Sequence, residues 1–565
     1  MKKITLLFLI LPFFGLGQVQ IGQDIDGQDY SDLAGRAISI SLDGSIIAVG
    51  SPGSLGDNIG GNLAGQVRVF ENISGVWTQI GQDINGEAAV DRSGENLSLS
   101  ADGNIIAIGA SENDGNGFNS GHVRVYENIS GVWTQIGQDI DGVGSNDMFG
   151  RSIDISSDGS ILAVGGGAII NGSKGYVNIY ENINGTWSQI GSSIIGEGIG
   201  DNSGSSFDGG SISLSPDGST IIIGSETNNG NGDDAGHVRV YENISGVWTQ
   251  KGQDIDGDGD FYRFGGRVAL SASNTFFAAA STGNTETTFS LGYVKVYQYT
   301  GNTWVQVGQT LAGEDNFNKF GKSLSLSLDG SILIASAPGF NSSIGKTYVY
   351  KNINDSWVEL GSILGDYTFE LSGNSIDISE NMSILAIGSP ASGGNSNIPN
   401  GRARVFNIDD LLLSIPAFEE VIEDIAGNIN NISITASQLN SISGVSGAID
   451  GVNYTTALDN GTYADENSPT ALEIQFIIDL VNASLGLEEN SLFNFKLYPN
   501  PAKTQFTIQL DPSVQLDKIS IYNSLGQEVL TSKAYTVDTS KLSSGSYVVE
   551  VTTNQGKSTK QLIKN

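Results

Sequence analysis

Apolar and polar residues alternate in short runs between residues 18 and 409, and glycine-rich turns separate the runs. Such alternation, broken by Asp-Gly pairs, is typical of antiparallel strands joined by hairpins. We therefore predict a unit of four strands. In one representative copy the runs are 149–156, 160–165, 176–180 and 187–194, with a Ser-Asp-Gly turn at 157–159 and a variable loop before the third run.

This unit recurs seven times. An aromatic residue of the third run marks each copy, at Phe70, Tyr126, Tyr180, Tyr241, Tyr297, Tyr350 and Phe406, in steps of 53 to 61 residues. A fixed period of this size indicates a repeat architecture. Four antiparallel strands per period describe one blade of a β-propeller, in which radial packing buries both faces of every sheet.

The six tryptophans of the chain recur at the start of the fourth run. They are Trp77, Trp133, Trp187, Trp248, Trp304 and Trp357. An aromatic residue repeated at one position predicts packing between blades rather than a stacking platform for sugars.

One fourth run is missing after a third run, and its counterpart stands at residues 18–27, where the sequence matches 78–86. We predict that this N-terminal segment pairs beside 402–406 and closes the ring. The predicted fold class is all-β. It comprises a seven-bladed β-propeller closed by its N-terminal strand (18–409), a small helical module (410–492) and a C-terminal β-sandwich (493–565).

Composition narrows the function classes. The 565 residues include 76 glycines and no cysteine, which excludes disulfides, zinc–thiolate sites and cysteine nucleophiles. The net charge of −35 repels phosphate backbones and anionic membranes, so we expect no nucleic-acid partner. An acidic surface is a better binding partner for calcium ions, basic protein patches or neutral glycans. Alternatively, the acidic surface has no binding role and only keeps the protein soluble.

The N-terminus has the pattern of a secretory signal. Lys2 and Lys3 precede an apolar run at 4–14 and small residues at 15–17. That run is too short to span a bilayer. We expect residues 1–17 to be a signal peptide, a mature chain from Gln18, and no transmembrane segment after cleavage.

The repeats resemble FG-GAP repeats, the blades of integrin-alpha-type propellers. The Phe-Gly pair stands at 149–150, 264–265 and 320–321, and the Gly-Ala-Pro counterpart stands at 50–52, 335–338 and 388–390. The resemblance covers about 18–409 and implies a propeller. One departure concerns metal. FG-GAP blades carry an Asp-rich calcium loop between their first two strands, whereas this chain has a tight Ser-x-Asp-Gly turn such as 41–44, which is similar to WD-type and TolB-type repeats. The family's calcium ligands are therefore not transferred.

One acidic cluster, Asp254, Asp256, Asp258 and Asp260, is a candidate Ca²⁺ site, because oxygen ligands at alternate positions suit that ion. Asp254 and Asp256 match repeat residues of another unit, and no closing glutamate completes a calcium loop. No other cofactor is expected. The two histidines, His122 and His237, occupy one repeat position and are expected to be structural.

Nothing in the sequence singles out catalytic residues. No unique His-containing constellation serves a serine nucleophile. Paired loop carboxylates could still hydrolyse glycosides, which is the alternative function. Loops between the second and third strands, and loops between units, are predicted to emerge on one side of the propeller. These loops vary most, and variable loops on a rigid scaffold are where recognition usually resides.

The segment 410–492 holds 13 acidic residues and no lysine or arginine. Short helices are predicted at 416–425 and about 470–482, where 470–473 form a capping box. Leu472, Phe476, Ile477 and Leu480 would form the apolar face of the second helix.

From residue 493 the chain resembles the C-terminal sorting domain read by the type IX secretion system. The segments that carry the resemblance are 496–502, 519–527, 537–549 and 560–564, all in the family's order. The resemblance implies a small β-sandwich recognised by the secretion machinery and later cleaved. We therefore expect a secreted or surface protein that binds an extracellular glycan or protein without catalysis. A structural surface-coat role is a further alternative.

Overall fold

The computed structural model describes most of the repeat region and most of the C-terminal region. The described residues are 19–54, 63–167, 173–206, 209–281, 291–314, 317–353, 355–391, 400–409, 411–412, seven single positions between 439 and 481, 496–498, 502–510, 514–522, 528–543, 545–553 and 556–564. Residues 1–17 and the predicted helix 416–425 lie outside them. The chain divides into two compact units, Met1–Leu413 and Ser414–Asn565, which are described separately.

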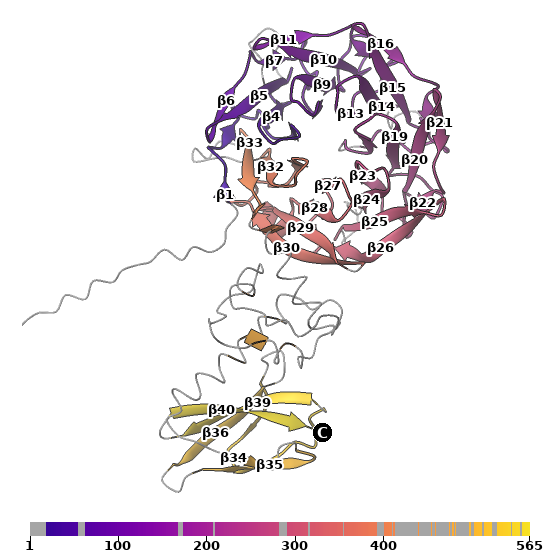
Figure 1. Ribbon diagram of the computed structural model, residues 1–565. Coiled ribbons are helices and arrows are strands. Elements are labelled where there is room, and N and C mark those ends of the chain that lie inside the picture. Colours follow the sequence, from indigo (N-terminus) through magenta and orange to yellow (C-terminus); the bar gives the residue numbers. More distant parts are fainter. Residues whose placement is uncertain are drawn as a thin grey trace, which may run out of the picture. The chain divides into compact units, whose positions relative to one another are not determined.

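The first unit contains seven antiparallel sheets (Figure 1). Sheets 1 to 4 share the same strand order, with two short outer strands. Sheet 1 comprises β3 (Ala37–Ile40), β4 (Ile46–Ser51), β5 (Gln66–Ile73), β6 (Val76–Gln79) and β7 (Ile84–Asn85); sheet 2 comprises β8 (Asn96–Leu99), β9 (Ile105–Ala110), β10 (His122–Ile129), β11 (Val132–Gln135) and β12 (Ile140–Asp141); sheet 3 comprises β13 (Ser152–Ile155), β14 (Ile161–Gly166), β15 (Tyr176–Ile183), β16 (Thr186–Gln189) and β17 (Ile194–Ile195); sheet 4 comprises β18 (Ile212–Leu214), β19 (Thr220–Ser225), β20 (His237–Ile244), β21 (Val247–Gln250) and β22 (Ile255–Asp256).

Sheets 5 and 6 have one long outer strand, and sheet 7 takes its outer strands from the N-terminus. Sheet 5 comprises β23 (Phe264–Leu270), β24 (Phe276–Ser281), β25 (Tyr293–Thr300) and β26 (Thr303–Ala312); sheet 6 comprises β27 (Leu324–Leu326), β28 (Ile332–Ala337), β29 (Lys346–Ile353) and β30 (Ser356–Leu364), with the short α1 (Phe340–Ser343) before β29; sheet 7 comprises β31 (Ser375–Ile378), β32 (Ile384–Ser389) and β33 (Arg402–Asn407), with β1 (Val19–Gln20) and β2 (Ile25–Asp26).

The N-terminal segment pairs where the sequence predicts. In β1, Val19 is opposite Asn407, and in β2, Ile25 is opposite Ala403. Strands from the two ends of the repeat region therefore share one sheet, which ties these ends together.

The predicted continuous fourth strand is wrong for most sheets. In sheets 1 to 4 it is interrupted, as between β11 and β12, where Gly137 has a φ of +80°. A Cβ at Gly137 would lie 2.8 Å from Cδ1 of Trp187 in the next sheet. The strand bends at this glycine because the neighbouring tryptophan takes the space beside it.

The seven sheets are arranged around a common centre (Figure 1). First strands of consecutive sheets lie next to one another, from β3 through β8, β13, β18, β23 and β27 to β31, and β31 lies next to β3. Hydrogen bonds join sheet 7 to sheet 1: the Ile40 N–H donates to Asp377 Oδ2 (2.8 Å), and the Glu380 N–H donates to the Leu42 carbonyl (2.8 Å).

The Ser-x-Asp-Gly segments form the predicted tight turns between first and second strands. In the first of them, Asp43 Oδ1 accepts hydrogen bonds from the Ser41 hydroxyl (2.8 Å) and the Ser45 N–H (2.9 Å). The Ser41 hydroxyl oxygen in turn accepts from the Ile46 N–H (2.9 Å). Side chains therefore satisfy the backbone groups of the turn, and this explains why the motif recurs.

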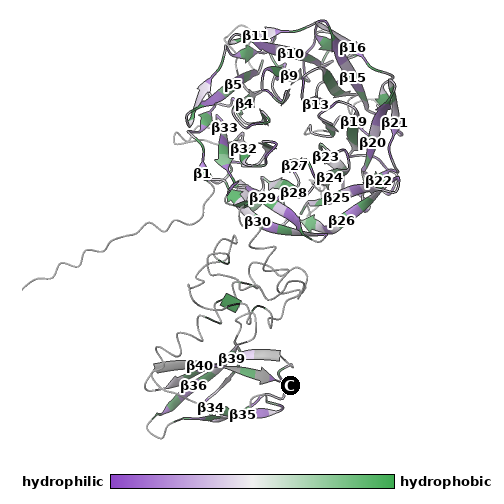
Figure 2. Ribbon diagram, in the orientation of Figure 1, coloured by the Kyte–Doolittle hydropathy of each residue, from purple (hydrophilic) through white to green (hydrophobic). Residues whose placement is uncertain are grey.

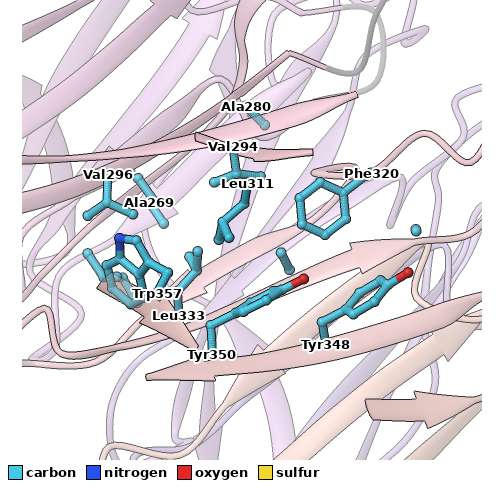
Figure 3. Packing of buried hydrophobic residues seen from close by; sticks show 14 residues of the cluster. Ala269, Ala280, Val294, Val296, Leu311, Phe320, Leu333, Tyr348, Tyr350 and Trp357 are labelled. Atoms are coloured by element: carbon cyan, nitrogen blue, oxygen red, sulfur yellow. The ribbon is translucent and has the colours of Figure 1, made fainter. Parts of the chain in front are cut away.

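Hydrophobic cores lie between neighbouring sheets. Figure 3 shows one of them, in which Val294, Val296 and Leu311 of sheet 5 meet Phe320 and Trp357 of the sheet 6 unit. Figure 2 shows hydrophobic and hydrophilic residues side by side within the strands. A sheet with a neighbour on each face can bury apolar side chains on both, and the second strands are accordingly buried almost throughout.

The described residues of the second unit form two further antiparallel sheets. One comprises β34 (Lys496–Tyr498), β35 (Gln505–Gln509) and β38 (Thr536–Asp538), and the other comprises β36 (Leu516–Tyr522), β37 (Glu528–Ser532), β39 (Gly545–Thr553) and β40 (Gly556–Lys564). Residues of both sheets, including Phe506, Ile519 and Val549, form one hydrophobic core. Because the two sheets pack against each other, one face of each is shielded from water.

Four residues of the predicted helix at 470–482 are described, namely Ile474, Ile477, Ile478 and Val481. They are helical, and the three isoleucines are buried. Ile477 belongs to the predicted apolar face and is one of these buried residues. The other three predicted positions, 472, 476 and 480, lie outside the described residues. None of the helices in the described part of the chain is long and apolar enough to cross a membrane.

Candidate functional site

The most variable loops of the repeat unit meet at one end of the sheets. Antiparallel strand order places the loop between second and third strands at the same end as the connection to the next sheet. These loops also touch: the Asn146 N–H donates to the Phe118 carbonyl (2.7 Å), and the Phe261 N–H donates to the Asp233 carbonyl (2.6 Å). We call this end the loop face. Its connecting loops span 27–34, 86–93, 142–149, 196–203, 257–264, 313–320 and 365–372.

A buried polar side chain organises most connecting loops. Asp147 accepts hydrogen bonds from the Val143 N–H (2.8 Å), the Gly167 N–H (2.8 Å) and the Tyr176 hydroxyl (2.6 Å). Burial and the hydrogen bond to this carboxylate raise the pKa of Tyr176. The equivalent residues are Asp32, Asp91, Asp201, Asn318 and Glu370, all buried, whereas Tyr262 occupies this position in the loop at 257–264. The sequence analysis did not predict these buried polar side chains. The acidic residue two positions before the Phe149-Gly150 pair was the signal that could have indicated them.

The residues that flank this buried side chain adopt left-handed backbone conformations. In one loop φ is +67° at Phe317 and +53° at Lys319, and in the next it is +64° at Phe369 and +57° at Leu371. Non-glycine residues rarely adopt this region, and bulky ones do so only where the surrounding structure imposes it. The loops are therefore held in a set shape.

Large aromatic side chains project from four consecutive connecting loops into solvent. Phe369 is 70% exposed, Tyr30 is 67% exposed and Phe317 is 58% exposed. We call the group the aromatic arc, and it consists of Tyr30, Phe261, Tyr262, Phe317, Tyr367 and Phe369. The other three connecting loops expose aliphatic residues instead, at Val90, Val143 and Ile199. Gathered exposed apolar side chains mark binding surfaces more often than scattered ones do.

Arginine anchors one loop of the arc. Arg402 Nη2 lies 2.6 Å from Glu370 Oε1 and 2.7 Å from Asp366 Oδ2, and its Nη1 lies 2.5 Å from Asp24 Oδ2. The guanidinium also lies over the ring of Tyr367. Arg402 and Glu370 are buried, whereas Asp24 and Asp366 are partly exposed. The ion pairs orient the loop at 365–372, because charged groups out of water require such partners.

The four aspartates predicted to bind Ca²⁺ have separate partners. Asp254 Oδ1 accepts from Gln250 Nε2 (2.5 Å), as Asp139 accepts from Gln135 in sheet 2. Asp256 sits opposite His237 in the sheet. Asp258 pairs with Lys295 Nζ (2.6 Å), and Asp260 Oδ1 accepts from the Asp233 N–H (3.0 Å). The Ca²⁺ assignment stays a prediction.

The two histidines each lie near two carboxylates. Glu87, His122 and Asp139 bring one ligand atom each within 4.8 Å of one another, and Glu197, His237 and Asp254 repeat the arrangement. Burial, followed by the nearby Arg124, lowers the pKa of His122 to about 4, so its imidazole is neutral. Arg124 Nη1 lies 3.2 Å from Glu87 Oε1 and already balances its charge.

Comparison with known proteins identifies the C-terminal strands. Residues 496–565 match the secretion system C-terminal sorting domain. This domain directs export by type IX secretion, so the protein reaches the cell surface or the extracellular space and its tail engages the type IX machinery. The match does not extend to the repeats, whose FG-GAP resemblance stays a prediction. No curated protein matches the chain.

Proposed function

We propose that residues 18–409 form a seven-bladed β-propeller, exported by type IX secretion, that binds an extracellular glycan or protein without catalysis. The propeller assignment is supported by seven antiparallel sheets of four or five strands and by the N-terminal strands that complete sheet 7. The neighbour relation between β31 and β3 supports closure of the ring.

The aromatic arc is the observation that supports binding. Aromatic side chains supply large contact area at low cost in conformational entropy, and they are enriched where partners dock. Here the backbone on which several of them stand is fixed before any partner arrives, because the buried side chains of Glu370 and Asp32 accept hydrogen bonds from N–H groups of their loops. A preformed surface loses little conformational entropy on binding, so more of the contact energy appears as affinity.

The test is affinity electrophoresis of the full chain against a panel of neutral and acidic polysaccharides, with Phe317→Ser/Phe369→Ser as the arc variant. The matched control is Val76→Ser/Val132→Ser, which removes exposed apolar side chains at the opposite end of the sheets. We expect at least one polymer to retard the wild type and the control but not the arc variant. Equal retardation of all three proteins would show that the arc is not the site. If no polymer retards the wild type, the proposal that the protein binds a glycan is wrong. The remaining candidates are then binding of a protein partner and a structural surface-coat role.

A second candidate function is glycoside hydrolysis. The carboxylates of Glu87 and Asp139 lie within 4.8 Å of each other, as do those of Glu197 and Asp254. Retaining glycosidases place two carboxyl groups about 5 Å apart. New reducing ends from a polysaccharide, lost in Glu87→Gln/Glu197→Gln, would favour this function over binding.

A further inference from the structure

The six tryptophans join consecutive sheets through their indole N–H groups. Each donates to a backbone carbonyl in the outer strand region of the preceding sheet, at 2.7 to 3.2 Å. Trp187 Nε1, for example, donates to the Ile136 carbonyl (3.1 Å). This contact explains why the outer strand bends where the next sheet's indole arrives.

A glutamine side chain completes five of these six junctions. At Trp133, Gln82 Nε2 donates to the tryptophan carbonyl (2.7 Å), and the tryptophan N–H donates to Gln82 Oε1 (3.1 Å). The same two bonds, which we call the glutamine clamp, join Gln23 to Trp77, Gln138 to Trp187, Gln253 to Trp304 and Gln309 to Trp357. A primary amide satisfies an outward-facing N–H and C=O together.

The junction between sheets 3 and 4 lacks the clamp. Ser192 stands at the glutamine position, and Ser193 stands where Asp139 follows Gln138 in the preceding sheet. Within the described residues no side-chain amide reaches the backbone of Trp248. Its indole is partly exposed, whereas the other five tryptophans are 3% to 4% exposed.

A pocket of about 300 Å³ opens at this junction. Ser192, Ser193, Tyr241 and Trp248 contribute to its walls together with Gly191, Gly246 and aliphatic side chains. The space that a glutamine takes in the other junctions is here open. The volume lies at the lower end of the range for small-ligand sites.

The lining selects the ligand class. It contains no Asp, Glu, Lys, Arg or His, although the chain as a whole has a net charge of −35. Arg239, whose guanidinium lies over the Tyr241 ring, already pairs with Glu197 (3.5 Å), so a neutral ligand is favoured over an ion. In place of the amide, a ligand would accept a hydrogen bond from the Trp248 N–H and donate one to the Trp248 C=O, and two neighbouring hydroxyls of a sugar can do both. The electron-rich indole face attracts the weakly positive C–H face of a pyranose ring.

We propose that this pocket is a binding site for one neutral sugar residue, which stacks on Trp248 and takes the hydrogen-bonding place of the missing glutamine. The site is distinct from the aromatic arc and does not depend on it. A glycan bound on the loop face and a sugar bound between sheets 3 and 4 would be separate events.

The test introduces a glutamine clamp at the junction between sheets 3 and 4. Ser192→Gln/Ser193→Asp introduces the residues found at other junctions, so it should fold and unfold at an equal or higher urea concentration. Saturation-transfer NMR on the full chain uses methyl α-mannoside, methyl β-galactoside and N-acetylglucosamine as probes, with N-acetylglutamine amide as an amide probe. Val132→Ser, which changes an exposed residue of sheet 2 outside the pocket, is the control.

We expect transfer from the wild type and Val132→Ser to at least one sugar, and an affinity at least about tenfold lower in the clamped variant, since two hydrogen bonds and the stacking surface are lost. The arc variant Phe317→Ser/Phe369→Ser should keep the signal. The absence of transfer to any sugar, or equal transfer to the clamped variant, would overturn the proposal. Transfer to the glutamine amide alone would overturn the sugar assignment and indicate a peptide amide ligand.

Discussion

The carboxyl group of Asp377 should make the repeat region less stable as pH rises through the weakly acidic range. Asp377 Oδ2 accepts from the Ile40 N–H (2.8 Å) and the Ser39 hydroxyl (3.1 Å), and so joins sheet 7 to sheet 1. Burial raises its pKa to about 6, against hydrogen bonds that lower it, whereas the ordinary value is 3.8. The folded protein therefore holds this proton more tightly than the unfolded chain does.

The sign and size of the change in stability with pH follow from these two pKa values. Below pH 4 the group is protonated in both states and imposes no penalty, and between pH 4 and 6 the penalty for ionising it in the folded state grows. A shift of about two pKa units corresponds to about 3 kcal/mol, which we reduce to about 2 kcal/mol because the side chain is only partly buried. Asp377→Asn removes the titration. Its unfolding free energy, relative to wild type, should rise by about 2 kcal/mol from pH 4 to pH 7.5.

Urea unfolding followed by tryptophan fluorescence measures this difference, because all six tryptophans lie in the repeat region. Asp43→Asn is the control. Burial raises the pKa of Asp43, but hydrogen bonds from Ser45 and Ser41 outweigh it and lower the pKa overall. Its stabilising contribution is therefore present above pH 4 and is lost only as pH falls further. A difference between Asp377→Asn and wild type that stays constant from pH 4 to 7.5 would refute the raised pKa.

Three further outcomes are expected. Gln138→Ala should lower the urea midpoint, with a cost of about 0.5–1.5 kcal/mol, because the partly buried N–H and C=O of Trp187 lose their amide partner; Ser192→Ala, where no clamp exists, should leave the midpoint unchanged. Arg402→Met/Arg404→Met should destabilise the repeat region by about 3–5 kcal/mol, because Glu370 Oε1 pairs with both arginines (2.6 and 3.5 Å) and its buried carboxylate would lose both counter-charges, and an unaltered unfolding curve would contradict this account. Deletion of 496–565 should leave the protein inside the producing cell, as judged by cell fractionation, and undiminished export would show that another signal acts.

Several features of this fold were predictable from sequence because neighbouring residues encode them. The alternation in each run, the Ser-x-Asp-Gly turns such as 41–44 and the recurrence of the third strand depend on contacts within a few residues of the chain. The N-terminal strand was found in the same way, since 18–27 carries the pattern of an outer strand without a preceding partner. The sorting domain was recognisable from four short segments in order.

The rest depends on contacts between sheets, which a pattern along one strand does not contain. Asp147 is an ordinary loop aspartate in the sequence, and only folding places it against the Gly167 N–H and the Tyr176 hydroxyl. Gln138 reads as an exposed polar residue, yet it clamps Trp187 across 49 residues of chain. For the same reason the sequence shows that Ser192 stands at a glutamine position but not that a clamp is lost there. Tertiary structure alone decided that one missing amide opens a pocket beside Trp248, because the partner of that amide belongs to the next sheet.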